Sequence, residues 1–335
     1  MMKYLFMRQL NKQRLCCLSL VFLILIFLPF ASIYQNYTAA HAYDLLNSEE
    51  KFLYDVMQTL TEPLVSDPVQ LDALKGTTWS ARIGGYKISD PLAVVSQSFA
   101  SWSWNPSFAA TALIPLLVSL LAGRIFCGWI CPATLLYELN TNFALFLNKL
   151  GVPIHRWHFD RRLKYGVLIS GTLITMLSGL MILPAIYPPA IVGREIYYAI
   201  ALDGFSISTI FFVLTMMADT FIARRGFCRY LCPGGALYSL LGRYRLLRIQ
   251  RKVSVCNDCQ RCDSICEFGL EPMSDQFGQE CNNCTACIAI CPTDSLQFHW
   301  TPVDQPYQGP GHQGRQYVAA NTDLIATDTR SSCCE

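Results

Sequence analysis

Two stretches of the chain repeat one pattern, and this repeat decides the fold: Arg124-Ile-Phe-Cys-Gly-Trp-Ile-Cys-Pro132 and Arg225-Gly-Phe-Cys-Arg-Tyr-Leu-Cys-Pro233. At one constant offset, from 124 to 225, the arginine, the phenylalanine, both cysteines and the proline coincide. A leucine, a tyrosine and a second leucine beyond the proline coincide as well. Each unit has the pattern C-x3-C-P, so the chain contains an internal duplication.

The paired cysteines of each unit are candidate metal or redox ligands. In a helix, residues i and i+4 share a face, so Cys127 and Cys131 point together, as do Cys228 and Cys232. We expect the following proline to end or kink the helix, and the two halves to bring all four thiols together. Such a site suits a further iron–sulfur cluster, a soft metal such as Cu(I), or a dithiol–disulfide couple. Small apolar cysteines that only pack helices are the alternative.

Apolar stretches flank the repeat, and each is near the length of about 20 residues that a membrane helix needs. They cover residues 15–33, 108–125, 165–186 and 204–223. The whole chain of 335 residues is 52% hydrophobic and only 15% charged, whereas soluble domains carry about 25% charged residues. For 15–33 the alternative is a cleaved signal peptide, but no A-x-A-like cleavage site follows closely. We therefore expect an α-helical membrane protein with four transmembrane helices in two duplicated halves.

Basic residues in the connecting segments predict the orientation, because Lys and Arg stay on the cytoplasmic side. They gather in 1–14, 126–164 and 224–252, which we expect to be cytoplasmic, whereas 34–107 has eight acidic residues against four basic ones. Segments 34–107 and 187–203 are then periplasmic loops, and neither contains a cysteine. The prediction is a multi-pass protein of a bacterial inner membrane, with both termini cytoplasmic and every candidate ligand thiol on the reducing side.

The long outer loop is predicted to be partly structured. Ser48 is placed to cap a helix whose apolar residues share one face, and Arg82–Ile88 has the pattern of a short hairpin. Trp79, Trp102 and Trp104 are expected to be anchors at the membrane interface.

Eight of the sixteen cysteines fall in two runs of identical spacing: Cys256-Asn-Asp-Cys-Gln-Arg-Cys-Asp-Ser-Ile-Cys266 and Cys281-Asn-Asn-Cys-Thr-Ala-Cys-Ile-Ala-Ile-Cys291. In a C-x2-C-x2-C-x3-C run, three thiolates hold one [4Fe–4S] cube and the fourth reaches the other cluster. The expected ligand sets are Cys256, Cys259, Cys262 and Cys291 for cluster 1, and Cys281, Cys284, Cys287 and Cys266 for cluster 2. A zinc site, which uses cysteine pairs in fours, is the alternative.

This region resembles the bacterial two-cluster ferredoxins, and we expect residues 253–300 to form a cytoplasmic α+β domain of that kind. The first run departs from the pattern because Glu267 stands where the second run has Pro292. Proline at this place is not a ligand, so the departure is expected to affect packing or potential rather than occupancy. The remaining residues, 301–335, are rich in Gly, Gln, Thr and Pro and are predicted to be disordered.

Other features of the sequence narrow the function. A net charge of +2 gives no excess of positive charge for nucleic-acid binding. Asp219 lies in an apolar stretch, where an unpaired charge is costly and marks a candidate functional site; it is a candidate catalytic residue for proton transfer, or else a boundary residue beside Arg224. We assign no role to Cys16, Cys17, Cys333 and Cys334.

Taken together, the paired F-C-x3-C-P units, Cys232-Pro-Gly-Gly-Ala-Leu-Tyr-Ser-Leu-Leu-Gly242 and the two-cluster run resemble the NapH/MauN family of membrane ferredoxin-type proteins. Ser89-Asp-Pro-Leu92 also fits that family. NosR and CcoG are more distantly similar through their C-x3-C-P units.

The resemblance implies a quinol-dehydrogenase-like electron-transfer component, as in nitrate reduction or methylamine oxidation. We expect electrons to pass between the quinone pool and a periplasmic or membrane redox enzyme, together with a further ferredoxin-type or cytochrome subunit. Two one-electron clusters suit a quinol, which releases two electrons. The alternative is a maturation factor that supplies electrons for metal or disulfide reduction while a periplasmic redox enzyme is assembled.

Overall fold

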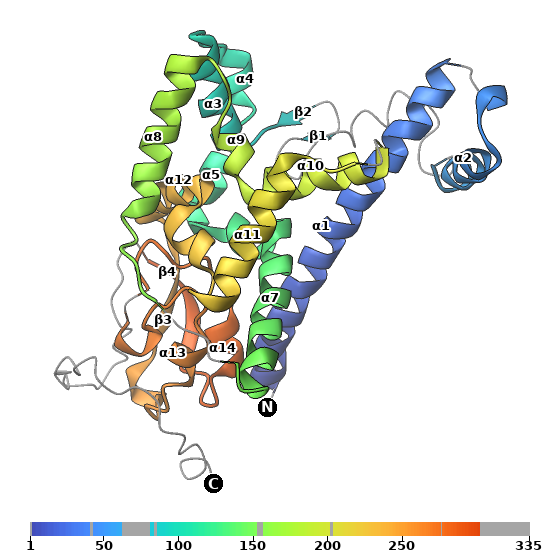
Figure 1. Ribbon diagram of the computed structural model, residues 1–335. Helices are drawn as coiled ribbons and strands as arrows, with labels where there is room; N and C mark the ends of the chain where they lie inside the picture. Colours follow the sequence, from blue (N-terminus) through green and yellow to red (C-terminus); the bar gives the residue numbers. More distant parts are fainter. Residues whose placement is uncertain are drawn as a thin grey trace.

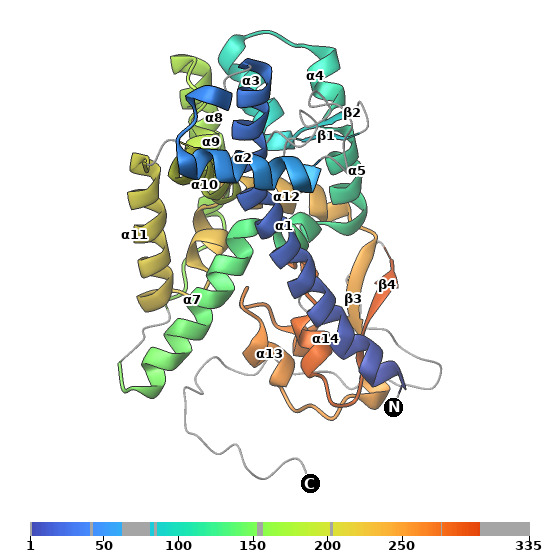
Figure 2. The ribbon, with the colours of Figure 1, turned by 90° about the vertical axis from the view of Figure 1, so that its right-hand side faces the viewer.

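Helices dominate the structure, a computed structural model that describes residues 2–40, 43–61, 81–83, 86–152, 157–201, 204–275 and 277–301. Within these residues the strands form two separate two-stranded sheets. Figures 1 and 2 place the sheet β3–β4 at one end of the molecule and helices α3 and α8 at the other. The helical character of the predicted fold is confirmed, while the predicted disordered tail lies, apart from Thr301, outside the described residues.

Helix α1 (Met2–Ala40) runs along the molecule from the end that carries α14 (Figure 2). Its stretch Leu10–Ala31, 22 residues long, is the one described segment long and apolar enough to cross a membrane. Leu20 and Leu23 in this stretch are 56% and 62% exposed. An exposed apolar face of this kind is typical of a helix that contacts lipid or another protein.

The other three apolar stretches form shorter helices than the sequence predicts. One consists of α4 (Pro106–Ala110) and α5 (Leu113–Ala122), α8 (Leu163–Ser178) ends at Gly179, and α11 (Ile207–Phe221) has 15 residues. Gly179 has a left-handed backbone, with φ of +69°, which glycine adopts without strain and which ends a helix. All three are shorter than the about 20 residues of a typical membrane helix, so helix length does not establish the four-span layout.

The duplicated motif folds in two similar ways. Helix α6 (Ile125–Trp129) leads into α7 (Pro132–Lys149), and η3 (Phe227–Leu231), one turn of π-helix, leads into α12 (Pro233–Leu241). Each proline begins a new helix, because proline in the first turn sacrifices no hydrogen bond. Helices α6 and η3 therefore end before the proline, which is one of the two predicted outcomes, and Cys131 and Cys232 lie at the junctions with the next helix.

The two halves of the duplication exchange packing partners. Helix α12 packs against α5 of the first half, and α7 packs against α11 of the second half. Each helix that follows a C-x3-C-P unit therefore lies on the helix that precedes the other unit. This arrangement brings the two units together although about a hundred residues separate them in sequence.

The outer loop contains the two predicted elements. Helix α2 (Ser48–Thr61) follows the short turn η1 (Tyr43–Leu45). Ser48, the predicted cap, is its first residue, and the cap position belongs to Asn47, whose carbonyl accepts from the Lys51 N–H at 2.9 Å. Strands β1 (Ala81–Ile83) and β2 (Tyr86–Ile88) form the predicted antiparallel hairpin.

Three further helices are α3 (Pro91–Ser101), α9 (Leu183–Ile186) and α10 (Pro188–Ala201). Helices α3 and α10 lie in the predicted loops 34–107 and 187–203, whereas α9 forms the end of the apolar stretch 165–186. Helix α10 packs against α1 and α11, and the side of the membrane on which 187–203 lies stays a prediction. Asp90, whose side chain accepts a hydrogen bond from the Leu92 N–H (3.1 Å), caps α3, which explains where this helix starts.

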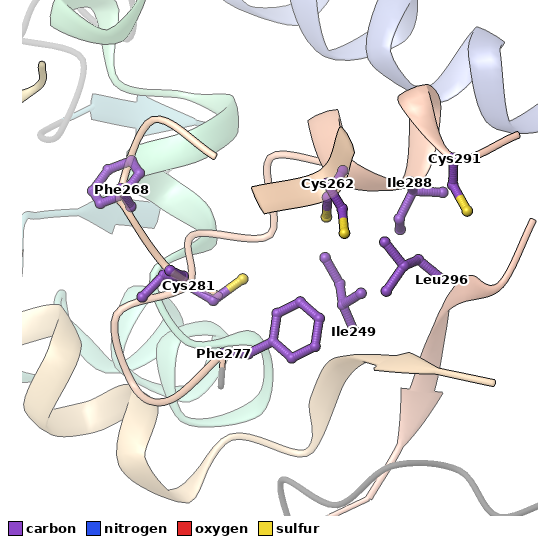
Figure 3. Close-up of a cluster of buried hydrophobic side chains, with 10 residues drawn as sticks. Ile249, Cys262, Phe268, Phe277, Cys281, Ile288, Cys291 and Leu296 are labelled. Carbon is purple, nitrogen blue, oxygen red and sulfur yellow. The ribbon is translucent and has the colours of Figure 1, made fainter. Parts of the chain in front are cut away.

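Residues 247–300, called here the ferredoxin-like segment, form one end of the molecule. Strand β3 (Leu247–Arg251) pairs antiparallel with β4 (Leu296–Trp300), and the cysteine runs carry the short helices α13 (Arg261–Ile265) and α14 (Ala286–Ile290). Short turns η4 (Gly242–Tyr244), η5 (Val253–Val255) and η6 (Pro272–Ser274) complete this end. Figure 3 shows its core, in which cysteines lie among aliphatic and aromatic side chains.

Candidate functional site

Four thiols of the duplicated motif meet between the two halves. One enclosed cavity is lined by Cys127, Cys131, Cys228 and Cys232 together. We call this the four-cysteine site. Tyr187, between α9 and α10, and Phe268, from the ferredoxin-like segment, line the same cavity. The structure therefore brings together the two pairs that the sequence predicts to converge.

The second cysteine of each unit has the same backbone geometry. Cys131 has φ −62° and ψ 116°, and Cys232 has φ −62° and ψ 117°. The Cys131 N–H donates to the Phe126 carbonyl at 2.9 Å, and the Cys232 N–H donates to the Phe227 carbonyl at 2.8 Å. In the second unit the Gly235 N–H also donates to the Cys232 Sγ at 3.3 Å. Hydrogen bonds to sulfur are one means by which a protein tunes an iron–sulfur centre.

The chemistry of these donors fits an iron–sulfur cluster. Burial raises the pKa of the Cys131 and Cys232 thiols to about 12, so they carry protons at neutral pH unless a bound metal replaces them. Among the described residues no three His, Cys, Asp or Glu side chains gather closely enough to hold one metal ion. A single zinc or copper ion draws its ligands around one centre, whereas a cube offers four separate irons.

Thiols of the two ferredoxin-type runs also mix. Burial, and then the neighbouring thiols of Cys284, Cys281, Cys266 and Cys262, raise the pKa of Cys287. Cys266 and Cys262 belong to the first run, so thiols of both runs lie around Cys287. Cys256 interacts in the same way with Cys262 of its own run. The division of these thiols into two crossed ligand sets stays a prediction.

The backbone of the two runs is duplicated as well. Asp258 and Asn283 have left-handed φ values of 56° and 53°, and Gln260 and Thr285 have 57° and 64°. Gln260 and Thr285 directly precede α13 and α14. Left-handed residues are rare outside glycine, so their recurrence at one offset shows that the cysteine spacing dictates the same tight turn twice.

The two cysteine regions share a boundary at Phe268. This residue packs in the core of the ferredoxin-like segment and also lines the four-cysteine cavity. Cys228 of the four-cysteine site packs against the same core. Figure 3 shows Phe268 and Cys281 toward one side of that core and Cys291 toward the other. Cys281 therefore lies nearer this boundary than Cys291 does.

Asp219 lies near the end of α11, ahead of the second motif. Its Oδ1 accepts a hydrogen bond from the Phe227 N–H at 2.9 Å, and the carboxylate is 8% exposed. Arg225 and Arg229 interact with it electrostatically. The structure thus gives Asp219 a capping contact to η3, while the predicted proton transfer stays a prediction.

Asp90 is a buried acid that the sequence analysis did not single out as a functional candidate. Tyr238, in α12, donates a hydrogen bond to Asp90 Oδ1 at 2.9 Å. Burial raises the pKa of Asp90 to about 6, and hydrogen bonds from Leu92, Tyr238 and Tyr187 oppose the shift. The predicted layout put Asp90 and Tyr238 on opposite sides of the bilayer, whereas the structure places them in contact, so this part of the predicted layout does not fit the structure. The Asp-Pro pair was the available signal, as the start of a capped helix.

Four remaining cysteines belong to none of these groups. Cys16 is exposed and Cys17 is half-buried, both in α1. Cys333 and Cys334 lie outside the described residues, as does Trp79. Trp102 and Trp104 are 70% and 73% exposed, and their role as interface anchors stays a prediction.

Comparison with known families gives the four-cysteine site a precedent. Residues 104–153 and 205–255 each match the family described as a 4Fe-4S binding domain. These two ranges contain all four C-x3-C-P cysteines and lie outside the two ferredoxin-type runs. A 4Fe-4S ferredoxin-type domain is therefore present, and its match falls on the duplicated motif.

Curated proteins with similar sequences are ferredoxin-type proteins. The methylamine utilization ferredoxin-type protein MauN of Paracoccus denitrificans is 32% identical over 190 residues, which cover 56% of this chain and 64% of MauN. The ferredoxin-type protein NapH of Haemophilus influenzae is 29% identical over 227 residues, which cover 63% of this chain and 75% of NapH. A putative electron transport protein of Escherichia coli, YccM, is 24% identical over 242 residues, 67% of this chain and 66% of YccM.

The resemblance to NapH and MauN is thus confirmed. The matched region spans a little under two thirds of the length of the MauN protein. No solved structure matches the chain.

Proposed function

We propose that this chain, which is similar to the NapH and MauN ferredoxin-type proteins, is a membrane-anchored iron–sulfur protein that passes electrons between the quinone pool and a redox partner. Support for the membrane comes from the 22-residue apolar stretch of α1 and from the relatives. Support for iron–sulfur chemistry comes from twelve cysteines in three groups. The finer parts of the proposal are the ligand sets and the quinol link.

One observation carries the proposal: the four C-x3-C-P thiols line a cavity that also touches Phe268, two residues after Cys266. A cofactor in the four-cysteine site would be the neighbour of a cofactor held by Cys266. Electron transfer needs cofactors that are close together and shielded from water, and the protein supplies this arrangement. Packing cysteines alone would not explain why the ferredoxin-like segment lies directly over the thiols.

The residues that would hold each group are as follows. Cluster 1 would be held by Cys256, Cys259, Cys262 and Cys291, cluster 2 by Cys266, Cys281, Cys284 and Cys287, and a third by Cys127, Cys131, Cys228 and Cys232. Each bound [4Fe–4S] cluster would supply one-electron transfer. The chain orients these thiols and excludes water, since Cys131, Cys232, Cys262 and Cys287 are each less than 10% exposed.

Iron content tests the third site. Anaerobically purified protein with three [4Fe–4S] clusters holds about twelve irons per chain, and the double variant Cys127→Ser/Cys228→Ser is expected to hold about eight. Cys16→Ser, which changes an exposed cysteine of α1, is the matched control and should change nothing. Equal iron content in wild type and double variant would remove the third cluster from the proposal.

A quinol site is supported by an apolar cavity of about 400 Å³ between α3, α5 and α8. Trp102 and Trp104 line its outer part, and Pro91 and Leu237 also line it. These last two residues directly adjoin Asp90 and Tyr238, whose hydrogen bond lies beside the four-cysteine site. Ligand sites of this size are commonly apolar with a few polar groups.

Direct reduction tests the quinol link. Oxidised protein is mixed anaerobically with a water-soluble quinol of adequate driving force, and cluster reduction is followed by EPR. Reduced clusters are the expected result. Clusters that stay oxidised, while dithionite reduces them normally, would exclude direct quinol oxidation and leave the electron-transfer proposal to a protein donor.

Deletion of the gene separates electron transfer from the maturation alternative. Loss of an electron-transfer subunit leaves the partner redox enzyme fully assembled but without electrons, so an artificial donor restores its turnover. Loss of a maturation factor leaves the enzyme without its cofactor, and the artificial donor then has no effect. We expect the first outcome.

A further inference from the structure

Arg124 and Arg225, which occupy equivalent positions in the two C-x3-C-P units, are among the most deeply buried charges of the described residues. Arg124 is 0% exposed and Arg225 is 3% exposed. A buried guanidinium is costly unless a carboxylate pairs with it. The identity of the two partners is therefore informative.

Each arginine pairs with a glutamate that adjoins a cysteine of the ferredoxin-like segment. Arg124 Nη1 donates to Glu280 Oε2 at 2.7 Å, and Arg225 Nε donates to Glu267 Oε2 at 2.5 Å. Glu280 immediately precedes Cys281, and Glu267 immediately follows Cys266. Both cysteines belong to the proposed cluster 2.

The Arg225–Glu267 ion pair explains why the first cysteine run departs from the ferredoxin pattern. Glu267 stands where the second run has Pro292, and proline cannot pair with an arginine. The glutamate therefore appears at the run where the next residue, Phe268, lines the four-cysteine cavity. The two equivalent arginines thus each pair with a glutamate, and the two glutamates adjoin different cysteines of the proposed cluster 2.

The same arginines also face the four-cysteine site. Arg124 Nη2 donates to the Cys228 carbonyl at 3.3 Å, and its guanidinium lies 5.1 Å from the centre of the Phe268 ring. Arg124 interacts electrostatically with Cys127, Cys228 and Cys232, and Arg225 with Cys228. Each arginine therefore lies between the thiols of the four-cysteine site and a glutamate that adjoins a cysteine of the proposed cluster 2.

We propose that Arg124 and Arg225 are positioning residues that hold the cluster 2 ligands against the four-cysteine site and place positive charge between these two cysteine sites. Cluster 2 is then the nearer of the two ferredoxin-type centres, and cluster 1 is the farther. The inference rests on the proposed function only in assuming that iron–sulfur clusters occupy these sites.

The two ion pairs differ in a way that selects the test. Glu280 also pairs with Lys164, which in turn donates to Ser239 at 2.8 Å, so its removal leaves two buried cations without a carboxylate. Arg225 keeps a second carboxylate, Glu138, at 3.4 Å. Glu267→Gln is therefore the milder change, and Glu271→Gln, at an exposed glutamate of the same segment, is its matched control.

The experiment is a redox titration of the purified full-length protein, followed by EPR. Loss of a nearby negative charge stabilises the reduced, more negative cluster, so Glu267→Gln should shift the midpoint potential of cluster 2 to a more positive value. Arg225→Gln should shift it to a more negative value, and Arg225→Lys should retain most of the wild-type potential. Cluster 2 is identified as the signal lost in Cys284→Ser.

Measurements of iron content and amide hydrogen exchange distinguish a positioning role of these residues from a general loss of protein structure. We expect Glu267→Gln and Glu271→Gln to keep the wild-type iron content, and only Glu267→Gln to speed amide exchange around α13. If a single arginine variant fails to fold, the exchanged pair Arg225→Glu/Glu267→Arg should restore iron content and slow exchange.

Two results would overturn the inference: unchanged potentials in Glu267→Gln at full iron content, or a shift confined to cluster 1. Wild-type protein without clusters would instead contradict the proposed function, so the two failures are distinguishable.

Discussion

The four-cysteine site and the ferredoxin-like segment both use duplicated cysteines, but they assemble them over different distances. The proposed ligands of the ferredoxin-like segment lie within Cys256–Cys291, where two short turns have equal geometry. The four-cysteine site takes its thiols from Cys127–Cys131 and Cys228–Cys232, which meet only because α7 and α12 exchange packing partners. The first site depends on local turns, and the second depends on the packing of the helices.

Removal of a buried ferredoxin-type ligand should have the largest effect. Cys287 is 8% exposed and belongs to the core of the ferredoxin-like segment, in which four of the buried members are cysteines. Because cluster binding and folding are coupled in such a core, Cys287→Ser should lose about four irons and make this end sensitive to protease. Cys127→Ser should leave the same end resistant. Iron analysis and limited proteolysis of both variants test the contrast, and equal protease resistance would contradict it.

Asp90 allows a test of the four-cysteine side through pH. Its folded pKa is raised from 3.8 to about 6 by burial, so between these values the folded state binds more protons than the unfolded state, and stability falls as pH rises. A shift of about two units corresponds to about 3 kcal/mol. Asp90→Asn keeps an acceptor for Tyr238 and should remove this slope.

The measurement is chemical unfolding in detergent from pH 4 to pH 7, comparing Asp90→Asn with wild type. Stability of the variant relative to wild type should increase up to about pH 6 and then stay constant. A constant difference across the whole range would show that Asp90 is not titrating in the folded protein.

Contact between the two regions is tested by a smaller change. A Cβ at Gly128 of α6 would lie 2.5 Å from the Asn282 carbonyl oxygen, beside Cys281. Because the backbone must shift, Gly128→Ala should destabilise the protein by about 1–3 kcal/mol. Gly166→Ala, in α8 with no atom within 4 Å of the new Cβ, should cause no loss of stability. Thermal unfolding checks both, and equal midpoints would mean that α6 and the ferredoxin-like segment are not in contact.

The difference between local turns and helix packing also explains which features can be predicted well from the sequence. Spacing within each ferredoxin-type run predicts its ligand sets, because three or four residues determine each turn, and the structure repeats these turns at the same offset in both runs. The convergence of Cys127 and Cys228 also follows from the internal duplication. Helix α2 and the Arg82–Ile88 hairpin were recognisable from local capping and strand patterns.

What the sequence misses depends on contacts between distant segments. Hydropathy alone predicts four continuous spans, but Gly179 ends α8 early and Thr111 separates α4 from α5. The partner of Asp90 lies in α12, and the partner of Arg225 is Glu267. No local pattern identifies such pairs, because only the folded chain brings them together.

Asp219 gives the smallest and most discriminating test. Its Oδ1 accepts the Phe227 N–H, so Asp219→Ala should lose a cap and cost about 1 kcal/mol, whereas Asp219→Asn keeps an acceptor and should cost less. If capping is its only role, the two variants reduce their clusters with quinol at the wild-type rate per folded protein. If Asp219 accepts a proton, Asp219→Asn slows reduction although its unfolding midpoint stays near wild type. We expect the first result, because the Asp219 carboxylate already has a structural role as the acceptor of a backbone N–H of η3. Only the second unit has this carboxylate, since the equivalent residue of the first unit is Val118.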